Sequence, residues 1–336
     1  MPFLGSNYLI LRDNNKVYFD SLDNIIDYQN IDNLEIPTTS GWSKFTLKKL
    51  DRTSASVKII NTKGNKHVSL SYNHPIFYHN RDNVGIHDMA RMVLFSDYDH
   101  SIQKIPLNTK KFDKYLNDFQ YLTYNDGFLI GLSYTAEKYL KSDNYLALKF
   151  KNINKDLADH IKHILKYCVI PCPKTVKMFN DELVIFLFDY DWTNIFYKHH
   201  NINWILYNSN LNNFCLDFIL YTNNAFLEGI VDALQLTMNF VYERNSDLYI
   251  DQYVSLLKIQ AFITSMGYYS SIDKFSDSNL YTLNIDKNKK KYELITSADQ
   301  SNTDPIYDIY PKGTCKDGSV AENIILPNGL IIPFSN

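Results

Sequence analysis

Over the first 105 or so residues, apolar and polar positions alternate in short runs separated by Asn, Asp and Gly. A period of two is the pattern of a strand with one buried face, and the intervening residues favour turns. The pattern predicts an all-β segment. Its expected strands lie at residues 8–11, 17–19, 56–60, 67–71 and 92–95.

From about residue 110 to 290 the spacing changes, and apolar residues recur every three or four positions, as on one face of a helix. Helices are expected at residues 127–139, 155–167, 225–236 and 248–266, with a strand at 145–150. A helix, a strand pair and a second helix occur twice, roughly a hundred residues apart. The middle of the chain is therefore expected to be an α+β pseudo-repeat.

After residue 291 the chain returns to short strands, the last of them in residues 323–332. A β domain interrupted by an α+β insert accounts for this order. The expected division is residues 1–108, 109–290 and 291–336, with the first and third parts forming one domain. A chain of 336 residues has room for two domains of ordinary size.

Composition and charge limit the possible partners. With 45% hydrophobic and 21% charged residues, no apolar run of about 18 residues and no basic-then-apolar leader, the sequence predicts an intracellular protein, cytoplasmic or nuclear, without a membrane partner. The net charge of −3 argues mildly against tight DNA binding. Residues 104–114 and 287–291 are basic, and they could be solvated linkers or nucleic-acid contacts.

The cysteines predict neither a disulfide framework nor a zinc site. The four are Cys168, Cys172, Cys215 and Cys315, and no second Cys or His pair at zinc spacing accompanies the first two. We expect reduced, structural thiols.

Two of the predicted helices begin with similar motifs, GFLIGL at residues 127–132 and FLEGIVD at 226–232. They resemble the LAGLIDADG motif of homing endonucleases, whose small third residue lets two helices pack backbone to backbone. Gly131 and Gly229 hold that position. The resemblance implies a two-motif homing-endonuclease domain in the middle of the chain.

The eighth position of that motif carries an acidic residue in active members, and the pair binds divalent metal at the scissile phosphates. Here these positions are Ala136 and Leu234, neither of which can bind a metal ion. The nearest carboxylates, Glu137 and Asp232, are either solvent-facing helix residues or a displaced metal site. Nuclease activity is therefore not expected, and Mg²⁺ would be needed only if the nuclease were active.

The flanking segments resemble the horseshoe-shaped, all-β Hint domain of inteins. Residues 5–10 (GSNYLI) and 17–22 (VYFDSL) are similar to the first intein block, and alignment without gaps puts Met1 at the position of the splicing nucleophile. A thioether cannot perform the N-to-S acyl shift. Ser6 is the nearest hydroxyl, and it fits a turn residue better than a nucleophile.

Residues 66–75 (KHVSLSYNHP) resemble the second intein block, in which a hydroxyl and an imidazole lie beside the upstream scissile peptide. Ser71 and His74 fit these positions. The resemblance gives His74 the role of a general acid that protonates the leaving nitrogen. The alternative for His74 is an exposed histidine before a proline.

Residues 306–310 (IYDIY) and 323–330 (NIILPNGL) resemble the last two intein blocks, and the sequence stops at Asn336. An intein ends on Asn because its side-chain amide attacks its own backbone carbonyl, forming a succinimide and releasing the downstream segment. Asp308 matches a block residue. Two helpers of this cyclisation are missing, because the penultimate His is Ser335 and the His expected after Asp308 is Cys315, or Glu322 with an insertion. Cys315 is either near the splice junction or an incidental loop thiol.

The resemblance leaves three functions open. The first is an autoprocessing element in which Ser71, His74, Asp308 and Asn336 retain part of a splicing site; it needs no cofactor, and its partners are the flanking host segments, the exteins. The second is a free-standing, HO-like DNA endonuclease. The third is a non-cutting module that binds double-stranded DNA through its sheets.

Overall fold

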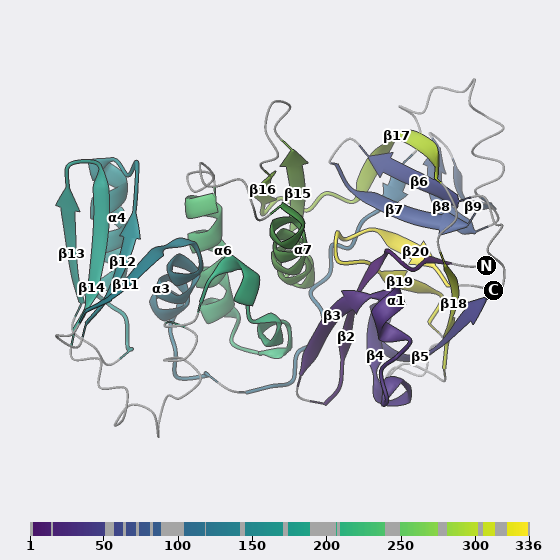
Figure 1. The fold of residues 1–336 in the computed structure, drawn as a ribbon, viewed down its shortest axis with the longest axis horizontal. Coiled ribbons are helices and arrows are strands. Elements are labelled where there is room, and N and C mark those ends of the chain that lie inside the picture. The colour runs from purple at the N-terminus through teal and green to yellow at the C-terminus, as the bar shows by residue number, and fades with distance from the viewer. Residues whose placement is uncertain are drawn as a thin grey trace. The chain divides into compact units, whose positions relative to one another are not determined.

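The computed structural model describes residues 3–14, 16–50, 57–62, 65–71, 74–80, 83–88, 104–117, 119–141, 145–170, 174–188, 206, 209–238, 249–274, 281–301, 305–312 and 321–334. The chain divides into two compact units, which we call the flanking unit and the central unit (Figure 1). The flanking unit contains Met1–Lys114, Leu257–Asp273 and Ile285–Asn336; the central unit contains Tyr115–Leu256 and Lys274–Asn284. Both ends of the chain thus share one unit, which also includes residues that the sequence pattern assigns to the insert.

The flanking unit is built on a twelve-stranded sheet in the order β3-β2-β4-β5-β18-β1-β7-β6-β17-β10-β8-β9, which does not close on itself among the described strands. The strands are β1 (Phe3–Leu4), β2 (Tyr8–Arg12), β3 (Val17–Ser21), β4 (Glu35–Thr38), β5 (Gly41–Leu50), β6 (Val57–Thr62), β7 (His67–Ser71), β8 (Pro75–Asn80), β9 (Asn83–Asp88), β10 (Lys104–Pro106), β17 (Tyr292–Ser301) and β18 (Ile306–Pro311). The strand expected at 92–95 lies outside the described residues.

Two late strands complete this sheet. β17 lies between β6 and β10, and β18 lies between β5 and β1, each antiparallel to its neighbours. Without β17 and β18, one edge of β1, β5, β6 and β10 would lack hydrogen-bond partners. The first segment therefore depends on the last one to form its sheet.

The core of the flanking unit collects apolar residues from both ends of the chain. Phe3, Phe45, Tyr307 and Phe334 are all nearly inaccessible to solvent and belong to one cluster. The short helix α1 (Leu22–Ile25) and the 3₁₀ turn η1 (Ile31–Asn33) lie between β3 and β4 in the sequence. A hairpin of β19 (Asn323–Ile325) and β20 (Ile331–Pro333) adds further core residues, and we call residues 323–333 the C-terminal hairpin.

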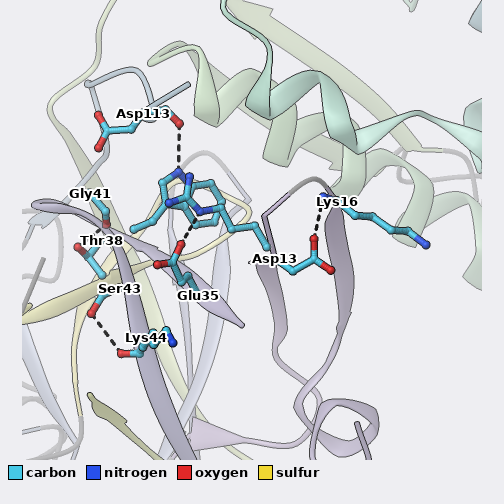
Figure 2. A network of polar contacts seen from close by, with 10 residues as sticks. Asp13, Lys16, Glu35, Thr38, Gly41, Ser43, Lys44 and Asp113 are labelled. Carbon is cyan, nitrogen blue, oxygen red and sulfur yellow. Dashed lines mark hydrogen bonds and ion pairs between the residues drawn. The ribbon is translucent and has the colours of Figure 1, made fainter. Parts of the chain in front are cut away.

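A buried arginine ties the sheet edge to the segment that leaves the unit. The Nε atom of Arg12 donates to Oε2 of Glu35 at 2.7 Å, and the guanidinium lies 4.4 Å from the centroid of the Trp42 ring. The indole N–H of Trp42 donates to the backbone carbonyl of Asp113 at 3.2 Å; Figure 2 shows Glu35 and Asp113 within this network. A desolvated cation packed on an aromatic face and paired with a carboxylate fixes β2, β4 and β5 relative to residues 108–113.

The central unit contains α3 (Tyr124–Thr135), α4 (Lys155–Leu165) and α6 (Asn224–Met238), and the 3₁₀ turns η3 (Leu211–Asn213) and η4 (Leu216–Leu220). Its four-stranded sheet has the order β11-β12-β14-β13, from β11 (Glu137–Lys141), β12 (Tyr145–Phe150), β13 (Lys174–Phe179) and β14 (Glu182–Leu187). The boundary between the units falls inside α7 (Tyr249–Ser265), which precedes β15 (Tyr269–Lys274) and β16 (Tyr281–Asp286).

Local sequence explains why the central helices begin where they do. Thr123 and Asp126 form a reciprocal capping box at the start of α3, and Asn154 caps α4 by accepting from the backbone N–H of Leu157 at 2.8 Å. α3 ends at Thr135, so the prediction of a helix to residue 139 was wrong. Ala136 has extended backbone angles, and the residues after it pair with β12, which gives them a ladder of hydrogen bonds that a helix would forgo.

The first copy of the expected repeat is present as α3, β11, β12 and α4, followed by β13 and β14. In the second copy, α6 and α7 are followed by β15 and β16, and the strand pair expected between the two helices would fall at 239–248, outside the described residues. Of the helices described, none combines the length and the apolar character that crossing a membrane requires.

Candidate functional site

His74 lies just before β8 and is completely buried in the flanking unit. Its ring packs edge-on against the ring of Phe3, with 4.5 Å between the centroids. Its Nε2 atom lies 3.0 Å from the backbone carbonyl oxygen of Pro333. The imidazole therefore contacts the first strand of the chain on one side and the last strand on the other.

Sheet topology brings these three groups together. β1 runs between β7 and β18, and Phe3 is paired with Leu70 on one side and Tyr307 on the other. β7, the strand beside β1, ends at Ser71, three positions before His74 in the sequence. The C-terminal hairpin supplies Pro333, which is paired with Asn323. The Asn323 side chain is itself fixed, because its oxygen accepts a hydrogen bond from the hydroxyl of Thr39 at 2.8 Å.

The contact with Pro333 fixes the proton on one nitrogen of His74. A carbonyl oxygen can only accept, so Nε2 must carry a hydrogen and donate it. Nδ1 is then the ring nitrogen with the lone pair, at which the imidazole can accept a proton. Histidine side chains serve as general acids and bases in this way. The alternative of an exposed histidine does not hold, because the ring is enclosed.

Asp308 lies in β18 and is also buried, with 7% of its surface exposed. Its Oδ2 accepts from the hydroxyl of Tyr310 at 2.8 Å, and this hydrogen bond raises the pKa of Tyr310. Neighbouring residues of a strand face opposite sides of the sheet. Because Tyr307 is paired with Phe3, Asp308 points to the face opposite Phe3. The structure thus places the sheet between the Asp308 carboxylate and the Phe3 ring that contacts His74.

The remaining predicted residues of the splicing site are described in part or not at all. Ser71 ends β7, where its backbone is paired with Val57, but its side chain lies outside the described part of the chain. Cys315, Ser335, Asn336 and Met1 also fall outside the described residues. Glu322 is exposed, and its carbonyl accepts from the backbone N–H of Phe334 at 3.1 Å.

Sequence reasoning missed two groups that contact His74, the Phe3 ring and the Pro333 carbonyl. The C-terminal hairpin itself had a signal, because Asn328-Gly329 is a strong turn pair, and Gly329 does adopt a positive φ of 85°. No sequence signal connects this hairpin with His74, which lies 259 positions earlier.

In the central unit, α3 and α6 pack directly against each other through their glycines. A Cβ on Gly229 would collide with the backbone of Tyr124 and Phe128, and one on Gly127 would collide with the carbonyl of Phe226. A Cβ on Gly131 would lie 2.6 Å from that of Ala233. The helices therefore approach so closely that only glycine fits at these positions.

The register of this contact differs from the one taken from the motifs. Gly127 meets the residue three positions before Gly229, and Gly229 meets the residue three positions before Gly127. Thr135 likewise donates to Thr237 at 2.8 Å, so the two helices are related by 102 positions. Gly131 then corresponds to Ala233, not to Gly229, and the motif alignment is one helical turn out of register.

This shift changes which residues occupy equivalent positions on the two helices. The position equivalent to Ala136 is Met238, and the one equivalent to Leu234 is Leu132. None of these four residues can bind a metal ion through its side chain.

The two carboxylates near the motifs have other partners. Asp232 accepts from the hydroxyl of Tyr124 at 2.8 Å, and Glu137 lies in β11 with an oxygen 3.9 Å from the Lys151 amine. Neither residue is therefore simply solvent-facing on a helix. Across the residues that the structure describes, no three His, Cys, Asp or Glu side chains are grouped as a metal site would require.

Near the C-terminal end of α3, one lysine amine and two serine hydroxyls form a chain of hydrogen bonds. The Nζ atom of Lys138 donates to the hydroxyl of Ser209, which in turn donates to that of Ser133 at 2.7 Å. Burial lowers the pKa of Lys138 to about 7. Lys138 lies in β11, two residues after Ala136, so a partly buried amine follows the end of α3.

A surface cavity of about 1040 Å³ lies beside the Arg12 network and contains none of the predicted site residues. Its lining is polar and includes Lys16, Tyr18, Tyr28, Glu35 and Lys44. No model of a known protein family matches the sequence, and no curated protein matches it.

Proposed function

We propose that this chain is an autoprocessing element of the intein type, with a Hint-like splicing domain interrupted by a degenerate, nuclease-inactive LAGLIDADG domain. The observation that carries the proposal is the position of His74. Its imidazole contacts Phe3, two residues after Met1, and the carbonyl of Pro333, three residues before Asn336. Protein splicing joins the two ends of the element, and the proposal is supported by the contact of one buried imidazole with both β1 and β20.

The chemistry assigned to Asn336 requires only this chain. The side-chain amide nitrogen attacks the backbone carbonyl carbon of Asn336, the peptide bond to the next residue breaks, and the released segment takes the proton on its new amine. A succinimide remains at the end of the element. Met1 aligns with the splicing nucleophile and a thioether cannot perform the acyl shift, so we assign the element cleavage at the downstream junction alone.

The LAGLIDADG assignment of the central unit is supported by the glycine contact between α3 and α6 and by the repeated order of helices and strands. Ala136 and Leu234, and their counterparts Met238 and Leu132, argue against nuclease activity. Metal-assisted phosphodiester cleavage needs carboxylates at the ends of the two motif helices.

The first test extends the chain by a short peptide at each end and follows the masses of the products over hours. We expect release of the downstream peptide, and loss of that release in Asn336→Ala, because alanine has no amide nucleophile. Asn14→Ala, which changes an exposed asparagine far along the chain, should leave the rate unchanged.

A gain in rate provides a second check of the same site. Ser335→His restores the penultimate histidine of the intein pattern and should accelerate the release. A wild-type mass that stays constant, with Ser335→His equally inert, would rule out the proposed activity.

Binding to double-stranded DNA is a second candidate function, favoured by one face of the central sheet. Leu146, Leu148 and Phe150 bury the other face. On this face, Lys149 and Lys177 lie in one cross-strand row through Val184, and the Lys177 amine lies 5.9 Å from the centroid of the Phe186 ring. Lysines beside an aromatic ring suit contact with a phosphate backbone, although a phosphate would have to displace Glu182, which pairs with Lys149 at 2.5 Å.

If this face binds DNA, affinity for a random duplex should fall steeply with salt, and Lys149→Ala with Lys177→Ala should reduce the logarithmic salt slope by about two. Fluorescence anisotropy with a labelled duplex measures both effects. Lys155→Ala, an exposed lysine on α4, should change neither. The absence of duplex binding at low salt would exclude this candidate and the endonuclease together.

A further inference from the structure

The flanking unit contains a lysine that is buried almost completely, with 3% of its surface exposed. Lys66 immediately precedes β7. Its Nζ atom donates to the backbone carbonyl of Ser270 at 2.6 Å and to the backbone carbonyl of Asn328. The amine therefore joins three segments that are far apart in the sequence: the start of β7, the strand β15 and the turn of the C-terminal hairpin.

The turn of the C-terminal hairpin is held by other groups of the same unit. The side-chain amide of Asn328 donates to the carbonyl of His67 at 2.8 Å, and the hydroxyl of Thr264 donates to the carbonyl of Pro327 at 2.9 Å. The backbone N–H of Asn108 donates to the carbonyl of Gly329 at 2.9 Å. Among these donors, only Lys66 is an ionisable group.

At its other end, the same hairpin presents the Pro333 carbonyl to His74. The two antiparallel strands are continuous from Asn323 and Pro333 to the turn, so a shift of the turn is transmitted along the ladder to Pro333. We infer that Lys66 is a positioning residue, whose buried amine fixes the turn of the C-terminal hairpin and thereby holds Pro333 against His74. Its effect on peptide release rests on the proposed function, whereas its effect on the hairpin does not.

The hydrogen-bond geometry suits an uncharged amine. A neutral amine has two N–H groups, and Lys66 has two backbone carbonyls to satisfy. Burial lowers the pKa of Lys66 to about 7, while Glu293 raises it and Lys290 lowers it. The neutral form is therefore the one that the closed hairpin favours from neutral pH upward.

The charged groups around Lys66 come from two other elements. Lys290 pairs with the buried Glu293 of β17 at 2.8 Å. From β15, Tyr269 lies between the two lysines, with its ring centroid 4.9 Å from Nζ of Lys66 and 4.6 Å from Nζ of Lys290. Burial and then Glu293 raise the pKa of Tyr269, with a smaller contribution from Asp273, so the phenol stays neutral.

The sign of the pH effect follows from these groups. When the hairpin opens, Lys66 reaches water and its pKa returns toward the ordinary value of 10.5. Between about pH 7 and pH 10.5 the open form then holds a proton that the closed form lacks. Raising the pH through this window must stabilise the closed hairpin, by roughly tenfold in the opening equilibrium per pH unit.

Hydrogen–deuterium exchange of the whole chain, read on peptides covering residues 323–333 and corrected for intrinsic exchange rates, tests this inference. From about pH 7 to about pH 9, protection of the hairpin amides should rise roughly tenfold per unit. In Lys66→Met this slope should vanish, because methionine has no proton to release when the hairpin closes. A flat wild-type profile, or a slope that survives in Lys66→Met, would overturn the inference.

Two matched variants distinguish the pH-dependent role of the Lys66 amine from the general stabilisation that any hydrogen-bond donor gives the turn. Thr264→Val removes a neutral donor from the same turn, so protection should fall while the pH slope remains. Lys290→Met removes the neighbouring cation, so the slope should persist and begin at a higher pH. If Lys66→Met fails to fold, the inference is still tested by the pH dependence of amide protection in the wild-type chain and by the pH at which that dependence begins in Lys290→Met.

Peptide release is measured on the same variants. If the wild-type chain releases the downstream peptide, Lys66→Met should slow the release, and the wild-type rate should follow the hairpin protection with pH. A wild-type chain that releases nothing, yet shows a Lys66-dependent exchange slope, would contradict the proposed function and leave the positioning role intact.

Discussion

Valine in place of Gly229 is expected to unfold much of the central unit at temperatures where the natural chain is folded. A Cβ at this position would collide with the backbone of Tyr124 and Phe128, which cannot rotate away as a side chain could. α3 and α6 would have to separate along their whole contact. We expect a loss of about 3 kcal/mol or more, which is a large part of the 5–15 kcal/mol that ordinarily separates folded from unfolded domains.

Chemical denaturation followed by circular dichroism measures this loss. Ala225→Val is the matched control, because Ala225 is exposed one turn earlier on the same helix, and valine there costs only helix propensity, about 0.5 kcal/mol. Gly127→Val should resemble Gly229→Val, since the two glycines occupy equivalent places in the contact. Similar stabilities for Gly229→Val and Ala225→Val would mean that the helices do not meet as described.

Introducing a thiol at position 1 is expected to make release of an upstream peptide depend on His74. In Met1→Cys with a peptide before it, the cysteine sulfur can attack the preceding carbonyl carbon, and the peptide moves from nitrogen to sulfur. A soluble thiol then releases it by exchange. His74→Gln should slow this release by a factor of about 10² to 10⁴, the usual contribution of a general acid.

Glutamine is chosen because it retains a donor for the Pro333 carbonyl and much of the buried volume. A fall in rate would then reflect the loss of proton transfer and not of packing against Phe3. His160→Ala, which changes an exposed histidine on α4, serves as the control and should have no effect. An unchanged rate in a folded His74→Gln protein would remove His74 from the proposed mechanism.

Much of the local structure follows from the sequence pattern. The strands at residues 8–11, 17–19, 67–71 and 145–150 lie within strands of the structure, because period-two patterns and turn residues are local signals. Helix ends were harder to place. Residues 136–139 continue the apolar spacing of α3, but Glu137–Lys141 pairs with β12, and no local rule reveals that partner.

The glycine register illustrates the same limit. Small residues recur four positions apart on both helices, as Gly127 and Gly131 on α3 and as Gly229 and Ala233 on α6. Two alignments, one turn apart, therefore fit the motifs about equally well. The packing selects one of them, since close approach requires the small residues of both helices to meet at the same level.

The sequence by itself determined the run of strands, helices and strands, the small residues that allow two helices to touch, and the lack of a metal-binding side chain at Ala136 and Leu234. These properties depend on residue type and short-range spacing. Only the tertiary structure decided that β17 and β18 enter the sheet of the first segment, that His74 contacts Phe3 and Pro333, and that Lys66 is buried under the C-terminal hairpin. Those contacts join residues that are far apart in the sequence, such as Phe3 and Tyr307, and they form because buried backbone and polar groups must find partners wherever the fold brings them.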